Sequence, residues 1–137
     1  VIRRENTYMR NYAEETQKRV QFIKDAVAAA HVDGIIFGNS GGKDSALVGI
    51  LCKKACENTL GIAMPCQSKR NFGEDMADAM DVAEQFGIET ITIDLSDVKQ
   101  ALMDTISEKA ELNQMALTNM APRLRMTPLY SVWSISW

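Results

Sequence analysis

Apolar residues recur along the chain in two alternating patterns, which predict helices and strands in turn. Some segments carry an apolar residue at every third or fourth position, as amphipathic helices do. Others are short apolar runs, bounded by glycine or rich in β-branched residues, which is typical of buried strands. The predicted elements are, in chain order, helix 14–30, strand 35–38, helix 44–57, strand 59–64, helix 74–86, strand 89–94 and a helix from residue 96 toward residue 112.

Each predicted strand is followed by a helix, and this order determines the expected fold class. Alternating strands and helices form a parallel sheet with right-handed crossovers and helices on both faces. We therefore predict an α/β domain with three layers, helix on sheet on helix. Gly87 is expected to end the helix that precedes it, and Ser96 to cap the helix that follows.

The last segment has a different character. Residues 119–130 are basic and contain two of the three prolines, and residues 131–137 read SVWSISW, with two tryptophans. Tryptophans so near the end of a chain need apolar surface to bury them. Pro128 is expected to disturb any helix in this segment, because a proline beyond the first turn removes a backbone hydrogen bond at a cost of about 3 kcal/mol.

Composition and charge narrow the function classes. With 137 residues, 46% of them hydrophobic, the chain suits one soluble domain with one core. The net charge of -3 argues against a nucleic-acid partner, and no apolar run is long enough to span a membrane. No signal peptide is visible and the three cysteines are odd in number, so we expect a cytoplasmic protein. Cys52 and Cys56 are expected to pack in the core, since His31 is the only histidine available for a metal site.

The stretch FGNSGGKDSALVG, residues 37–49, joins the first predicted strand to the following helix. Ligands of open parallel sheets collect at such strand ends. Gly41 and Gly42 lack a Cβ atom, so successive N–H groups at a helix N-terminus can form a nest for an anion. Ser40 and Ser45 offer hydroxyls to phosphate oxygens, and Asp44 suits a Mg²⁺ ion that bridges a carboxylate and phosphates.

Three phosphate-binding motifs compete for this loop. A Walker A loop requires glycine and then serine or threonine where this chain has Phe37 and Asp44, and the G-x-G-x-x-G spacing of a dinucleotide site is absent. The S-G-G-x-D-S loop of the N-type ATP pyrophosphatases is matched at every fixed position by SGGKDS, residues 40–45. The stretch therefore resembles the pyrophosphate loop of that family. A purely structural turn of this composition remains the alternative.

The resemblance implies cleavage of ATP between the α and β phosphates, with the loop stabilising the pyrophosphate that leaves. It also implies a Mg²⁺ ion on Asp44 and an adenosine site near the end of the second strand, from Ile62 to Met64. Gln67 and Ser68, which follow that strand, are further candidates. The residues implied to bind ATP and pyrophosphate are Gly38, Asn39, Ser40, Gly41, Gly42, Lys43, Asp44, Ser45, Met64 and Arg70.

A wider resemblance covers the chain from about residue 14 to residue 130. Similarity to ammonia-dependent NAD synthetase is seen in DGIIFGNSGGKDSALVGILCKKA, in LGIAMP and in the pair Asp78-Ala79. The segment NMAPRLRM, residues 119–126, is the more specific marker. A solvated basic helix start is the plainer alternative, although the planar donors of arginine suit carboxylates and phosphates. The residues that the resemblance implies for deamido-NAD are Asn119, Arg123, Arg125 and Tyr130.

This family resemblance implies a reaction, a fold and an assembly. The carboxylate of deamido-NAD would attack the α-phosphate of ATP to form an NAD-adenylate, from which ammonia displaces AMP to give NAD. The expected fold is the Rossmann-like fold of the adenine nucleotide alpha hydrolases, and the expected assembly is a homodimer.

The resemblance also implies segments that are absent from this sequence. In the family, a fourth strand and a G-T-D-x-x-E segment follow the tyrosine-containing helix, and their glutamate shares the Mg²⁺ ion. We therefore expect residues 1–137 to form one domain that is incomplete at its C-terminal side, with strand 35–38 at a sheet edge and with weak or no turnover. A nucleotide-binding or dimer-forming remnant without turnover, or another pyrophosphate-loop enzyme such as a GMP synthetase, remains the alternative.

Overall fold

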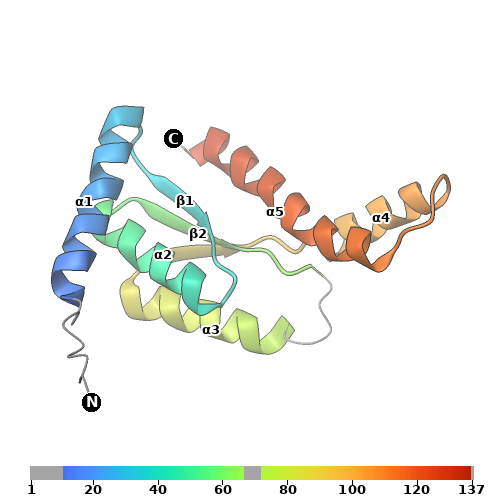
Figure 1. The fold of residues 1–137 in the computed structure, drawn as a ribbon, viewed down its shortest axis with the longest axis horizontal. Helices are drawn as coiled ribbons and strands as arrows, with labels where there is room; N and C mark the ends of the chain where they lie inside the picture. Colours follow the sequence, from blue (N-terminus) through green and yellow to red (C-terminus); the bar gives the residue numbers. More distant parts are fainter. Residues whose placement is uncertain (1–10, 67–71, 137) are drawn as a thin grey trace, which may run out of the picture.

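The computed structural model describes residues 11–66 and 72–136 of the chain. Helices and strands alternate in the predicted order, which confirms the α/β class (Figure 1). The elements are α1 (Tyr12–Ala30), β1 (Ile35–Gly38), α2 (Lys43–Ala55), β2 (Thr59–Ala63), α3 (Phe72–Phe86), β3 (Glu89–Thr92), α4 (Ser96–Ser107) and α5 (Gln114–Ser136).

The three strands form one parallel sheet in the order β1-β2-β3. β1 and β2 pair from Ile35 opposite Thr59 to Gly38 opposite Ile62. Because all three strands run in the same direction, their carboxyl ends lie on the same side of the sheet. The chain leaves β1 toward α2 on that side. Within the described residues β1 pairs only with β2, which confirms its predicted position at a sheet edge.

Helices cover both faces of the sheet, so the predicted layers are confirmed (Figure 1). α2 and α3 lie on one face, α1 packs against α2, and α5 covers the other face. Successive residues of a strand point to opposite faces. Accordingly Phe37 packs in the core beneath α2 and α3, while Ile62, which is fully buried, lies in the core that α5 covers.

Phe37 occupies a slot formed by two glycines. A Cβ atom at Gly49 would lie 2.4 Å from the Phe37 ring, and one at Gly61 would lie 3.3 Å from the ring and 2.7 Å from Thr90 Oγ1. Any side chain at these positions would therefore displace the ring or the strand. The glycine of α2 lets that helix lie close to β1, and this fixes where the connecting loop must run.

α5 continues through Pro122 and Pro128, so the disturbance expected at Pro128 does not end the helix. A proline inside a helix removes one backbone hydrogen bond, and the rest of the ladder remains. Leu124 and Leu129, on either side of Pro128, both pack against the core cluster around Ile62. Burial of these side chains offsets the lost bond and holds the helix against the sheet.

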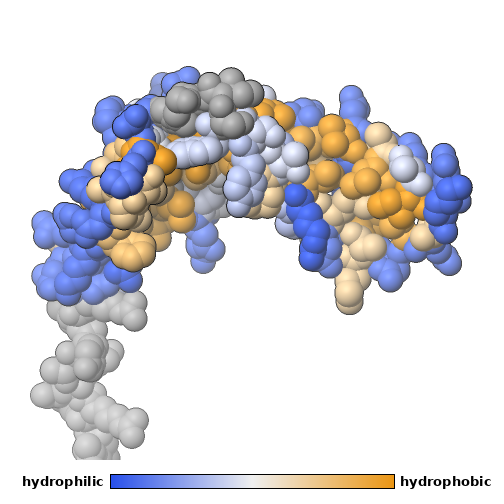
Figure 2. All heavy atoms as spheres, turned by 90° about the horizontal axis from the view of Figure 1, so that it is seen from above, coloured by the Kyte–Doolittle hydropathy of each residue, from blue (hydrophilic) through white to orange (hydrophobic). Residues whose placement is uncertain are grey.

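α4 contacts α5, and α4 extends beyond the sheet with the N-terminal part of α5 as an arm (Figure 1). Hydrophobic residues gather on the surface over this end of the molecule (Figure 2). Met115 and Tyr130 of α5 are 73% and 72% exposed, and Met126 is 47% exposed. These three residues are called the α5 outer face below. Trp133 is half-buried, and Trp137 lies outside the described residues.

The predicted helix ends are partly right. Gly87 follows α3 with φ +62°, which confirms it as the residue that ends the helix. Ser96 is not the cap of α4, because it is the first helical residue and Leu95 is the N-cap. Asp94 takes the capping role instead, since its Oδ1 accepts the Ser96 N–H at 2.8 Å. Hydrogen bonds from the Ser96 side chain and backbone lower the pKa of Asp94.

Cys52 is buried in the core, as predicted, and Cys56 is half-buried at the end of α2. Burial raises the pKa of the Cys52 thiol, and the neighbouring Cys56 raises it further. The Cys52 side chain therefore remains a neutral packing group. Among the helices that the structure describes, none is both long and apolar enough to cross a membrane.

Candidate functional site

Residues 38–45 run from the last residue of β1, through the connecting loop 39–42, into the first turn of α2, and they lie at the strand ends, as predicted. Gly41 has φ +80°, a left-handed conformation that favours glycine. Gly42 is the N-cap of α2 and supplies no side-chain hydrogen bond to the helix. The first amide groups of an α-helix have no acceptor within the helix. The start of α2 therefore presents backbone donors that a bound anion can use.

Side chains of the loop hold its shape. Asn39 is buried, and its Nδ2 donates to the Ala79 carbonyl oxygen at 3.0 Å, which ties the loop to α3. Ser45 Oγ donates to the Gly42 carbonyl oxygen at 2.9 Å and lies 2.9 Å from Ser40 Oγ. The Asn39 side chain is thus committed to the scaffold. The two serine hydroxyls bond to each other and would exchange partners when phosphate oxygens arrive.

The charged side chains of the loop are free for a ligand. Lys43 and Asp44 are the first two residues of α2, both are exposed, and neither forms an ion pair within the described part of the chain. The positive end of a helix dipole favours a carboxylate at the position of Asp44. The backbone amides nearby favour phosphate.

The donor set fits Mg²⁺ that arrives with a nucleotide. This ion is commonly bound by one or two carboxylates and by substrate phosphates while it keeps several waters. Asp44 offers one carboxylate, and the hydroxyls of Ser40 and Ser45 are further oxygen donors. No cluster of three or more histidine, cysteine, aspartate or glutamate residues that could hold a metal occurs among the described residues. The carboxylate and the nucleotide phosphates would therefore have to bind the ion together.

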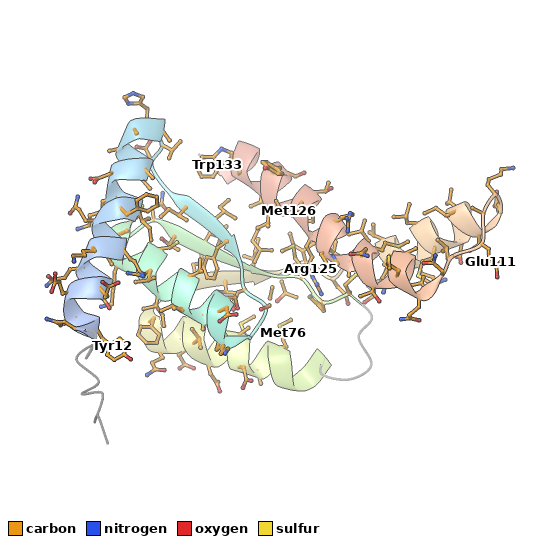
Figure 3. All side chains as sticks on the ribbon, viewed as in Figure 1. Tyr12, Met76, Glu111, Arg125, Met126 and Trp133 are labelled. Atoms are coloured by element: carbon orange, nitrogen blue, oxygen red, sulfur yellow. The ribbon has the colours of Figure 1, made fainter. Side chains whose placement is uncertain are left out.

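A cavity of 430 Å³ opens beside the loop at the carboxyl ends of the strands. This volume is typical of sites for small molecules. Three separate parts of the chain close it: the loop with the end of β2, the face of α3, and α5. Met76 on α3 and Arg125 on α5 approach it from opposite sides (Figure 3). The lining residues are Gly38, Asn39, Ser40, Gly42, Ile62, Ala63, Met64, Pro65, Cys66, Met76, Ala79, Arg125 and Leu129.

The structure brings most of the predicted ATP residues together. Gly38, Asn39, Ser40, Gly42 and Met64 line the cavity. The remaining loop residues, Gly41, Lys43, Asp44 and Ser45, complete the turn and the start of α2. Arg70, with its neighbours Gln67 and Ser68, lies outside the described residues.

Arg125 was predicted with the deamido-NAD residues, and the structure places it at the cavity beside the loop. Its Nε donates to the carbonyl oxygen of Met64 at 2.9 Å, across 61 positions of sequence. The residue is half-buried. Within the described residues its guanidinium forms no ion pair and no second hydrogen bond. A guanidinium carries five N–H donors, so most of its donors remain available.

The other predicted deamido-NAD residues lie elsewhere on α5. Asn119 and Arg123 line a groove of 370 Å³ between α4 and α5, and Tyr130 is exposed. Arg123 Nη1 donates to the Asn119 carbonyl oxygen at 3.0 Å. Two residues that are two positions apart in an α-helix point in directions that differ by about 200° around the helix axis. Arg123 and Arg125 therefore lie on opposite sides of α5, although the sequence motif contains both.

Several cavity residues were not predicted from the sequence, and Met76 and Leu129 are two of them. Met76 and Leu129 line the site, but their periodic spacing in the sequence indicates only helices that face a core. An apolar residue that packs in a core and one that lines a ligand cavity give the same helical pattern. The position of α3 and α5 relative to the strand ends distinguishes them.

Comparison with known proteins identifies one family. The NAD synthase family model matches residues 15–135. The chain is 40% identical over 123 residues to NH(3)-dependent NAD(+) synthetase of Carboxydothermus hydrogenoformans, covering 88% of this chain and 49% of that protein. It is 39% identical over 121 residues to the Finegoldia magna protein of the same name, covering 88% of this chain and 48% of that protein. The chain thus spans about half the length of the curated relatives it matches.

Solved structures agree with the sequence relatives. NH3-dependent NAD synthetase from Campylobacter jejuni is 30% identical with a TM-score of 0.81, covering 92% of this chain and 53% of that one. NMN synthetase from Francisella tularensis is 30% identical with a TM-score of 0.79, covering 88% and 49%. The family match continues to residue 135, beyond the limit at residue 130 that the sequence motifs suggested.

Proposed function

The chain belongs to the NAD synthase family, and from this premise we propose that it supplies the ATP site of an ammonia-dependent NAD synthetase. One observation supports this most directly. The pyrophosphate loop, the end of β2 and α5 all line one cavity at the strand ends, and its volume is 430 Å³. The cavity lies beside the first amides of α2, which have no acceptor within the helix, and it contains an arginine without an ion pair among the described residues. A polyphosphate requires donors of both kinds.

In the proposed complex, ATP binds with its phosphates on the loop and its adenosine toward the end of β2. The backbone N–H groups around Gly41 and Gly42 bind the pyrophosphate, together with the hydroxyls of Ser40 and Ser45 and the ammonium of Lys43. The two glycine amides, which donate to Asn39 Oδ1 and Ser40 Oγ in the structure, would exchange these acceptors for phosphate oxygens. Mg²⁺ would be held by Asp44 and the phosphates, and it would supply positive charge beside the pyrophosphate. Met64 and Arg70 are the candidates for adenosine contacts. Donors that are already oriented stabilise developing charge without reorganisation.

The proposed reaction forms an amide in two steps. A carboxylate oxygen of deamido-NAD attacks the α-phosphorus of ATP, and the bond to the β-phosphate bridging oxygen breaks. Pyrophosphate leaves with that electron pair, on the loop. Ammonia then attacks the carbonyl carbon of the NAD-adenylate, AMP leaves with the electrons of the C–O bond, and a proton is released. The loop residues act in the first step, since they bind the leaving group.

We assign the dinucleotide and the assembly to α5. Asn119, Arg123 and Tyr130 are spaced by four and seven residues, so they share one side of the helix, away from the sheet. The α5 outer face exposes Met115 and Tyr130, which a monomer has little reason to leave in water. We propose that two copies of the chain cover this face in a homodimer and that deamido-NAD binds beside it.

Pyrophosphate release tests the proposed activity. The protein is supplied with MgATP and ammonium, and with deamido-NAD, nicotinate mononucleotide or xanthylate in parallel. Release that depends on deamido-NAD is the expected result. Release with the mononucleotide alone would favour an activity like that in the name of the Francisella tularensis neighbour. Release with xanthylate alone would favour a GMP synthetase, and ATP binding without release would favour a binding module.

A further inference from the structure

Arg125 has three properties that its place in the sequence motif does not explain. It lines the cavity beside the pyrophosphate loop. Its Nε holds the carbonyl oxygen of Met64, just after β2, at 2.9 Å. It is half-buried, and within the described residues no carboxylate pairs with it. Partial burial of a cation costs free energy unless an anion lies beside it.

The geometry points to the α-phosphate of ATP as that anion. This inference rests on the proposed function, in which the loop binds the pyrophosphate and the adenosine lies near Met64. The α-phosphate joins those two groups, so it must lie between the loop and the end of β2. Arg125 is anchored at the end of β2 and lines the same cavity. We infer that Arg125 belongs to the nucleotide site, where its terminal Nη groups bind the α-phosphate.

The planar shape of guanidinium suits this double role. Nε donates along one edge of the group, and the two Nη atoms present further donors in fixed directions. One residue can therefore hold the strand end and bind a phosphate oxygen at the same time. A positive charge at this position would also stabilise the negative charge that accumulates on the α-phosphate during attack. Arg123, on the other side of α5, cannot reach this cavity.

A comparison of AMP binding with adenosine binding separates the role of Arg125 from that of the loop. The two ligands differ only in the α-phosphate, and both lack the pyrophosphate that the loop would bind. Isothermal titration measures both ligands on the wild-type chain and on Arg125→Gln, Arg125→Lys and Arg19→Gln. Arg19 is an exposed arginine of α1 that pairs with Glu15, so it serves as the matched control. Arg125→Gln is expected to raise the Kd for AMP by roughly ten-fold or more, which is the scale of a lost charge-assisted hydrogen bond. Adenosine binding should not change.

Arg125→Lys should lose part of the AMP affinity, because lysine keeps the charge but not the planar donors. Equal losses for AMP and adenosine would overturn the inference, since they would show that Arg125 only positions Met64. Unchanged AMP binding would overturn it too. If Arg125→Gln does not fold by circular dichroism, the comparison of AMP with adenosine on Arg125→Lys decides.

The failure of the proposed function would look different. In that case ATP would bind no better than AMP to the wild-type chain, because the pyrophosphate would gain nothing from the loop. Loss of the AMP preference in Arg125→Gln would still support the α-phosphate contact. A wild-type chain that binds AMP no better than adenosine would overturn the Arg125 inference alone.

Discussion

The two walls of the cavity are built in different ways. The loop wall is local, because residues 38–45 follow one another and bond to one another. The α5 wall is distant in sequence, because Arg125 bonds to Met64, which is 61 positions earlier. Leu129, on the same helix, also lines the cavity. The local wall can be recognised from a motif of six residues. The α5 wall depends on how a helix of 23 residues lies on the sheet, so a change far from the ligand can move it.

The difference predicts how each wall fails. The loop is fixed by the close approach of α2 to β1, which two glycines permit. The α5 wall is fixed by apolar side chains that pack on the cluster around Ile62. Damage to the first should disturb phosphate binding together with stability. Damage to the second should cost stability and displace Arg125, while the loop keeps its own shape.

The largest effect is expected from Gly49→Val. The new Cβ atom would lie 2.4 Å from the Phe37 ring, so α2 must move away from β1. Overpacking of this kind costs about 1–3 kcal/mol, and the displaced helix should also weaken ATP binding. Urea unfolding and ATP titration measure the two effects. Gly42→Ala is the control for stability, because its Cβ atom would meet only Ser40 Oγ at 3.4 Å. Equal stability of the two variants would contradict the proposed slot.

Leu129→Ala tests the α5 wall. Leu129 packs on the core cluster under α5 and lines the cavity. Since it is only partly buried, we expect a loss below the 2–5 kcal/mol of a full core truncation, about 1–2 kcal/mol. Urea unfolding measures it, with Val98→Ala on the exposed side of α4 as control. If ATP binding falls as strongly as in Gly49→Val, the two walls are not independent.

Asp44→Asn tests the loop without disturbing the fold. The carboxylate is exposed at the first turn of α2, so its loss should change the free energy of unfolding by only about 0.3–1 kcal/mol. Affinity for ATP in the presence of Mg²⁺ should fall by about ten-fold, since a charge-assisted contact is lost. Without Mg²⁺ the two proteins should bind ATP alike. Asp33→Asn, at the opposite end of β1, is the control and should bind MgATP normally.

The smallest effect concerns Asp94, which lies beyond both walls at the start of α4. Its pKa is lowered in the folded chain by hydrogen bonds from Ser96. A lowered folded-state pKa gives stability that is complete above the unfolded value of about 3.9 and disappears as pH falls through the folded value. Urea unfolding at several acidic pH values measures the effect. The free energy of unfolding of the wild type, relative to that of Asp94→Asn, should increase as pH rises through this range. A difference that does not vary with pH would contradict the assignment.

Much of the fold could be predicted from the sequence, because its signals are local. Helical spacing, β-branched runs and the glycine after α3 depend on neighbouring residues, and they predicted the order of elements and the parallel sheet. The SGGKDS loop was found in the same way, since a turn with positive φ at Gly41 is a property of a few adjacent residues. The prediction that Ser96 caps α4 was wrong, because Ser96 is itself the first helical residue. Its N–H group donates to the Asp94 side chain, two residues earlier.

Only the tertiary structure decided how α5 is used. The sequence placed Arg123 and Arg125 in one motif, and the rotation of the helix on the sheet sent them to different cavities. The sequence also predicted a disturbed helix at Pro128, which burial of Leu124 and Leu129 overcame. Local conformation depends on adjacent residues, whereas the direction in which a helical residue faces depends on packing against distant strands. That packing energy is not contained in any short stretch of the chain.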